Sequence, residues 1–178
     1  MHQEELESLI NAYGRDLYSF CCSVTRNTQE AEDLYQDTFL KLYEMKETLL
    51  IRKNPKSFLM SVSVNLYRNY KRKRSVRKKI IGTECSLEET VVDIPTGEQL
   101  TEEHILMQEK CQILRNEVKR LPDKYKIPIL LFYMEELSLK EICQILKLPE
   151  GTVKSRIYRA KKILKERLED SHYESYYR

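Results

Sequence analysis

The sequence predicts an all-α protein made of two small helical domains joined by a flexible linker, the C-terminal one a helix-turn-helix. Three observations lead to this prediction. The 178 residues include only four glycines and five prolines, too few turn signals for a sandwich or barrel. Apolar residues recur at helical spacing over most of the chain. The stretch 78–101 is polar, lacks an apolar period and is long for a loop, which indicates a connection between domains.

The first domain is expected to span residues 1–77. Its first helix is marked by apolar residues spaced by three or four positions: Leu6, Leu9, Ile10, Tyr13, Leu17 and Phe20. Asn27-Thr28 breaks this pattern, and Thr28 is expected to begin a second helix. A loop is expected over 51–55, because Asn54-Pro55 is a breaker pair. Ser57 then opens a long third helix that ends in a run of Lys and Arg.

The second domain is expected to span residues 102–178 and holds the most specific pattern. Ser138 and Glu141 have the spacing of a capping box, which begins a short helix. A tight turn follows at 148–151, and the next helix has a regular apolar stripe: Val153, Ile157, Ala160, Leu164 and Leu168. Its other face is basic: Lys154, Arg156, Arg159, Lys161, Lys162, Lys165 and Arg167. Two helices, a tight turn and a basic second helix predict a helix-turn-helix.

The net charge is only +3, but the charges are unevenly distributed. Residues 48–83 contain no Asp or Glu, whereas residues 80–109 contain no Lys or Arg. Separate basic blocks are typical of a protein that binds a polyanion. The alternative is a solvated basic face followed by an acidic linker, and charge alone does not decide between the two.

Other classes of function are disfavoured by what the chain lacks. No apolar run approaches the roughly 20 residues that span a membrane, and the N-terminal MHQEELESLI is too acidic for a signal peptide, so we expect a cytoplasmic protein. The three histidines and five cysteines follow no metal-binding or catalytic spacing. We therefore expect no enzyme activity, no small-molecule substrate, no cofactor and no metal.

Both basic helices have features suited to DNA. The N-terminal half of a helix in the major groove meets base edges, where Arg can bond guanine through two hydrogen bonds and Lys binds phosphate mainly as a point charge. We therefore assign Lys154 and Arg159 as candidates for base contact. In the helix from Ser57, an amide at Asn65, aromatic rings at Tyr67 and Tyr70 and the basic run could capture unstacked bases and hold phosphates.

Three segments resemble one family in the same order. The segment AEDLYQDTFLKLYE resembles the polymerase-binding helix of bacterial RNA polymerase sigma factors, and SFLMSVSVNLYRNYKRKR resembles their promoter-melting helix. The segment from LPDKYKIPILLFY through GTVKSRIYRAKKILKERL resembles the C-terminal helix-turn-helix of the extracytoplasmic-function (ECF) subfamily. The resemblance covers nearly the whole chain apart from the linker and the tail.

The resemblance implies a function, partners and sites. It implies a sigma factor that binds core RNA polymerase and directs promoter-specific initiation in a stress or envelope response, with promoter DNA and an anti-sigma factor as further partners. Residues 1–77 would be the region 2 domain, 78–101 an acidic linker and 102–178 the region 4 domain. The implied polymerase-binding residues are Asp33, Gln36, Asp37 and Leu40. Those implied for the -10 element are Lys53, Asn54, Lys56, Asn65, Arg68, Asn69 and Arg72. Those implied for the -35 element are Thr152, Lys154, Ser155, Arg156, Tyr158, Arg159 and Lys162.

Two other functions remain open at this point. A repressor or activator that dimerises on operator DNA would have a dimerisation surface and no need of the first basic block. An adaptor that uses its helices only for protein contacts would show no salt-dependent affinity for DNA.

Overall fold

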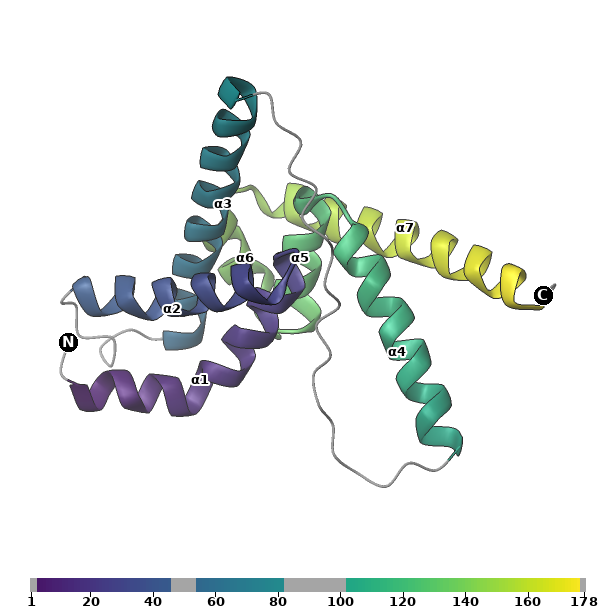
Figure 1. Ribbon diagram of the computed structural model, residues 1–178, viewed down its shortest axis with the longest axis horizontal. Helices are drawn as coiled ribbons and strands as arrows, with labels where there is room; N and C mark the ends of the chain where they lie inside the picture. Colours follow the sequence, from purple (N-terminus) through teal and green to yellow (C-terminus); the bar gives the residue numbers. More distant parts are fainter. Residues whose placement is uncertain (1–2, 46–53, 82–101, 177–178) are drawn as a thin grey trace. The chain divides into compact units, whose positions relative to one another are not determined.

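The computed structural model describes residues 3–45, 54–81 and 102–176, and in these ranges it contains seven α-helices and no strand. One compact unit contains α1 (Gln3–Val24), α2 (Thr28–Glu44) and α3 (Pro55–Ile81). The other contains α4 (Glu102–Arg120), α5 (Asp123–Tyr133), α7 (Glu150–Tyr176) and the first part of α6 (Leu139–Leu146). The all-α, two-part prediction is thus confirmed (Figure 1). None of the described helices is long and apolar enough to cross a membrane.

Helix α2 is the centre of the first unit, because it packs against both α1 and α3. It begins where the sequence predicts: Asn27 is its N-cap, and the side-chain oxygen of Asn27 accepts the Glu30 N–H at 2.8 Å. Such a cap satisfies one of the backbone donors that a helix start leaves unpaired. The buried side chains of α2 are Ala31, Leu34, Thr38, Phe39 and Leu42.

Helix α3 is longer at both ends than the sequence pattern indicated. It begins at Pro55 instead of Ser57, and the side chain of Asn54 caps it by accepting the Ser57 N–H at 3.0 Å. Proline is well tolerated in the first turn, where its missing N–H would have no helical partner. The helix continues to Ile81, so the first four residues of the stretch 78–101 are helical. Residues 51–53 of the expected loop and residues 82–101 lie outside the described residues.

The core of the first unit is built from all three helices. Its largest fully buried side chains are Leu17 and Phe20 of α1, Leu34 and Leu42 of α2, and Leu59 and Met60 of α3. Each such side chain contributes about 1.5–3 kcal/mol by leaving water. Three helices that share one core hold their outer faces in fixed directions, which is the property a binding surface needs.

The helix-turn-helix forms as predicted at both of its helix boundaries. The Ser138 N–H donates to Glu141 Oε2 at 2.8 Å, and the Glu141 N–H donates to Ser138 Oγ at 3.4 Å, which confirms the capping box. At the other end of α6, Lys147 has a φ of 55°, and the Leu148 N–H bonds the Cys143 carbonyl at 3.1 Å. This pattern is a Schellman motif, which usually places glycine at the left-handed position.

The apolar stripe of α7 faces inward as expected. Val153, Ile157, Ala160 and Leu164 are all buried. Ala160 and Leu164 pack with Leu121, just before α5, and with Ile129 of α5. The helix continues past Leu168 to Tyr176. Because the stripe faces the unit's own core, the opposite basic face of α7 lies outward.

The left-handed backbone at Lys147 predicts a stabilising substitution. Glycine adopts this conformation without the Cβ clash, so Lys147→Gly should raise the free energy of unfolding by about 1 kcal/mol. Lys140→Gly is the matched control, because Lys140 is an equally exposed lysine within α6. There, glycine should cost about 1 kcal/mol. Urea denaturation followed by helical circular dichroism compares the two, and destabilisation by both variants would contradict the interpretation of the turn.

Candidate nucleic-acid interface

The outward face of α7 presents most of the residues predicted for duplex DNA. Lys154, Ser155, Tyr158, Arg159 and Lys162 are exposed, and the Tyr158 side chain is among the most exposed large side chains, at 70%. Spacings of three and four place several of them on one surface of the helix. Thr152 and Arg156 are only partly exposed. This face therefore combines cations, a hydroxyl and an aromatic ring.

Several lysines of this face are paired with acids one turn away. Lys154 Nζ lies 2.7 Å from Glu150 Oε1, and this contact raises the pKa of Lys154 and lowers that of Glu150. Lys162 Nζ lies 3.8 Å from Glu166 Oε1. Exposed pairs of this kind contribute little to stability, so a phosphate can replace the carboxylate at low cost. Glu150 was not among the predicted residues, although its i, i+4 spacing to Lys154 is a visible signal.

Arg159 interacts with α5. Its guanidinium lies beside the Tyr125 hydroxyl and lowers the pKa of that phenol. The Tyr125 ring packs against the buried cluster that contains Ala160, the next residue after Arg159. Lys124 Nζ lies 4.8 Å from the centre of the same ring. Tyr125 of α5 thus offers the long Arg159 side chain of α7 a neighbour. This contact has no signal in the sequence, because it depends on the packing of two helices.

Four of the residues predicted for the -10 element form a continuous row on α3. Asn65, Arg68, Asn69 and Arg72 are all exposed, and their spacing places them along one side of the helix. Tyr67, in contrast, is only 6% exposed, so its ring belongs to the core. The prediction that this ring captures an unstacked base is therefore wrong. The row combines amides and guanidinium groups on a surface with no acidic residue from the same helix.

The other three residues predicted for the -10 element lie elsewhere. Asn54 caps α3, as described above. Lys56 Nζ lies 2.8 Å from Asp16 Oδ2 of α1, and its side chain is only 21% exposed. Lys53 lies outside the described residues. Of the residues predicted for the -10 element, the structure therefore places the four from Asn65 to Arg72 on one side of α3. Lys56 is not part of this row.

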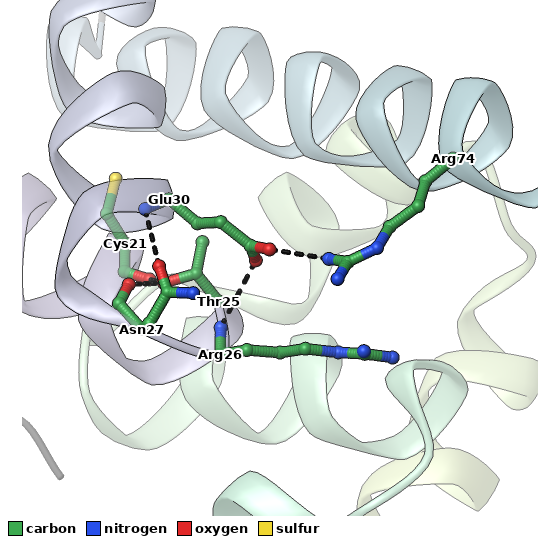
Figure 2. A network of polar contacts seen from close by, with 6 residues as sticks. All are labelled: Cys21, Thr25, Arg26, Asn27, Glu30 and Arg74. Carbon is green, nitrogen blue, oxygen red and sulfur yellow. Dashed lines mark hydrogen bonds and ion pairs between the residues drawn. The ribbon is translucent and has the colours of Figure 1, made fainter. Parts of the chain in front are cut away.

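A polar seam, formed by Glu30, Asp37, Tyr70 and Arg74, joins α2 to α3. Figure 2 shows Arg74 reaching across to Glu30, with 2.5 Å between Nη1 and Oε1. The other Glu30 oxygen accepts the Arg26 N–H at 3.4 Å, so this one carboxylate joins the start of α2 to α3. Further along, the Tyr70 hydroxyl donates to Asp37 Oδ2. This seam has no signal in the sequence, because its partners lie more than thirty positions apart.

The outer face of α2 has the composition of a protein-binding surface. Asp33, Gln36 and Asp37 are exposed together with Leu40, whose exposed fraction is 56%. Tyr43, three residues further, is 54% exposed and was missed, although it shares this face by spacing. Exposed large apolar side chains beside polar ones on a short helix are typical of a contact with another protein.

These features are typical of a DNA-binding protein, and α2 presents a further face of exposed apolar and polar side chains. The helix-turn-helix supplies one cationic surface, and α3 supplies a second one on a different compact unit. Within the described residues, no group of three or more His, Cys, Asp or Glu side chains could hold a metal ion.

Comparison with known proteins identifies the family. The family model for sigma-70 region 2 matches residues 9–77, and that for sigma-70 region 4 matches residues 111–164. The chain is 30% identical over 172 residues to the ECF RNA polymerase sigma factor SigW of Bacillus subtilis, covering 94% of this chain and 91% of SigW. It is 29% identical over 164 residues to SigM of the same organism, covering 90% of this chain and 93% of SigM.

The fold is shared with solved structures of this kind. The sigma factor RpoE in complex with the anti-sigma factor NepR, from Bartonella quintana, matches with a TM-score of 0.75 at 23% identity, covering 92% of this chain and 96% of RpoE. The chain belongs to the ECF RNA polymerase sigma factors. It is therefore a transcription initiation factor that binds core RNA polymerase and directs it to promoters, and its family is non-catalytic.

The Glu150–Lys154 pair predicts a variant with increased DNA affinity. Glu150→Gln removes an acid from the outward face and frees the Lys154 ammonium for DNA. Holoenzyme formed with this variant should bind promoter DNA more tightly, with a salt dependence steeper by about one unit of slope. Glu109→Gln, which removes an exposed acid from α4 instead, is the control for loss of one negative charge and should leave the slope unchanged. An unchanged slope for Glu150→Gln would show that Lys154 does not reach the DNA.

Proposed function

We propose that the two compact units divide promoter recognition between them. The unit within residues 1–77 binds core polymerase through α2 and the melted -10 strand through α3. The unit within residues 102–178 binds the -35 duplex through α7, and residues 78–101 connect the two. The observation that supports this division is that each DNA-facing row lies opposite a buried stripe of its own helix, so each is presented outward.

The -35 assignment follows from the shape and charge of α7. An α-helix fits the major groove with its N-terminal residues against base edges, and in α7 these are Lys154, Ser155, Tyr158 and Arg159. Tyr125 restricts the Arg159 guanidinium, which reduces the conformational entropy lost when a base is bound. Lys161, Lys162 and Lys165 lie further along the helix, where phosphate contacts are expected.

The -10 assignment rests on the row of α3. A single strand offers unstacked bases to amide and guanidinium groups and its phosphates to nearby cations. Asn65 and Asn69 supply the amides, and Arg68 and Arg72 supply the guanidinium groups of the same row. Lys53, Asn54 and Lys56 remain predictions for this element; of these, Lys56 would first have to leave Asp16.

The polymerase assignment rests on the outer face of α2. Leu40 and Tyr43 supply exposed apolar area, and Asp33 supplies a negative charge for a basic surface. A mixed face of this kind gives both affinity and orientation. The alternative of an adaptor without DNA contacts is disfavoured by the cationic rows on both units.

We expect an anti-sigma factor as a further partner. Two solved structures with this fold are complexes: RpoE with NepR, and CnrH with the cytosolic domain of CnrY at a TM-score of 0.61 and 18% identity. A partner that covers the α2 face or the α7 face would prevent initiation. The protein would act in the cytoplasm, where RNA polymerase is found, and its release would serve a stress or envelope response.

In vitro transcription tests the proposal. Core RNA polymerase should initiate from specific sites on genomic DNA only when this protein is added, and charge reversal at Asp33 should abolish the activity without unfolding the protein. A chain that binds DNA alone and leaves core polymerase unaffected would instead be a repressor or activator.

Truncation of Arg159 separates base recognition from phosphate binding. Arg159→Ala should cost about 1–3 kcal/mol on the preferred -35 sequence and less on a scrambled one, because a base contact is lost. Lys165→Ala should weaken binding equally on both and reduce the salt slope by about one. Binding of holoenzyme to matched and scrambled promoters over a salt series measures both. Equal losses on the two sequences for Arg159→Ala would remove Arg159 from the base-reading set.

A further inference from the structure

Asp37 lies at the boundary between the two working faces of the first unit. It is exposed on α2 beside the residues assigned to polymerase, yet its Oδ2 accepts a hydrogen bond from Tyr70 of α3. Among the described residues, Asp33 and Leu40 have no such hydrogen bond with α3: Asp33 accepts from Gln29 of its own helix at 3.0 Å, and Leu40 is 56% exposed. Of the four residues assigned to polymerase, Asp37 is therefore the one whose side chain hydrogen-bonds α3 in the described part of the chain.

Tyr70 is held at the edge of the core. Tyr67, one turn earlier, is only 6% exposed, whereas Tyr70 remains partly exposed. Burial and the nearby carboxylates of Asp37 and Asp33 raise the pKa of Tyr70, so its hydroxyl remains a donor throughout the physiological pH range. A change of pH within that range therefore does not remove the Tyr70 donor. A competing partner for the Asp37 carboxylate can still break the bond.

The docking of α3 on α2 does not depend on this bond. One turn further along α3, Arg74 binds Glu30 at 2.5 Å, and Leu59 and Met60 are buried in the core. Opening the Tyr70–Asp37 bond would therefore change two side chains and leave the helices in place. A local change of this kind can accompany binding without unfolding the unit.

We propose that the Tyr70–Asp37 hydrogen bond is a latch that core polymerase opens by taking the Asp37 carboxylate for a Lys or Arg of its own. This inference rests on the proposed function, in which α2 binds polymerase. In the free protein, Tyr70 competes for the carboxylate and directs it toward α3. In the holoenzyme, the Tyr70 hydroxyl and ring become available beside the row that binds the promoter strand.

Linkage makes the latch reciprocal. If the closed bond opposes polymerase binding, then polymerase binding opposes the closed bond by the same free energy. A variant that cannot close the latch should therefore bind polymerase more tightly. A purely structural role for Tyr70 predicts the opposite sign, because lost packing or a misplaced Asp37 would weaken binding.

Tyr70→Phe in the full-length chain tests the latch, because it keeps the ring and removes only the donor. The dissociation constant for core polymerase, measured by fluorescence anisotropy of labelled protein, should fall about five-fold, the effect of one competing hydrogen bond. The matched control is Tyr13→Phe, since the Tyr13 hydroxyl of α1 has no partner among the described residues. That variant should leave the constant unchanged. Unchanged or weaker binding by Tyr70→Phe would overturn the latch.

A double-mutant cycle separates the latch from the proposed function. Asp37→Asn should weaken polymerase binding, because an amide cannot pair with a cation, and in that background Tyr70→Phe should have no further effect. If Asp37→Asn has no effect, Asp37 does not contact polymerase and the latch is excluded, while binding through Asp33 and Leu40 can still stand. If Tyr70→Phe strengthens binding equally in both backgrounds, its effect does not act through Asp37 and the latch is again excluded.

Discussion

The packing of α3 on α2 is the constraint on which the first unit depends. Buried Leu34 and Leu42 of α2 and buried Leu59 and Met60 of α3 belong to the core of this unit, and the polar seam runs along the edge of the α2–α3 contact. Together these contacts determine how α3 is rotated about its axis. The row from Asn65 to Arg72 is exposed because the opposite side of the helix is occupied. A change at this contact would thus alter DNA recognition without touching a DNA-binding residue.

The second unit applies the same principle to α7. Four buried residues, from Val153 to Leu164, hold one side of the helix on its own core, and the cationic side is left outward. The side chains on that outward face are then oriented individually. Tyr125 positions Arg159 from α5, and Glu150 occupies Lys154 until a stronger partner replaces it. The orientation of α7 about its axis determines which residues can reach DNA. The contacts with Tyr125 and Glu150 determine how readily Arg159 and Lys154 bind it.

The fold and the outward faces could be predicted because they depend on local patterns. The stripe of α7 and the capping box at Ser138 are spacings within one helix, so they are visible in the sequence and were confirmed. The seam between α2 and α3 could not be predicted, because Glu30 and Arg74 are 44 positions apart and meet only through tertiary packing.

The predicted site was less complete than the predicted fold for the same reason. Tyr67 and Tyr70 differ by one turn along the same helix, yet one is buried in the core and the other bonds Asp37. Periodicity places both near the inner side of α3 but does not show which hydroxyl finds a partner. Lys56 likewise has the charge expected for DNA, and only the structure shows that α1 offers it Asp16.

Photo-crosslinking from α2 and from α3 tests whether the first unit has separate faces for polymerase and for the promoter strand. A crosslinking amino acid replaces Gln36 on α2 or Asn69 on α3, both exposed, in holoenzyme bound to promoter DNA. We expect position 36 to crosslink to a large subunit of polymerase and position 69 to crosslink to the promoter strand at the -10 element. Crosslinks from position 69 to polymerase alone, or from position 36 to DNA, would contradict this expectation.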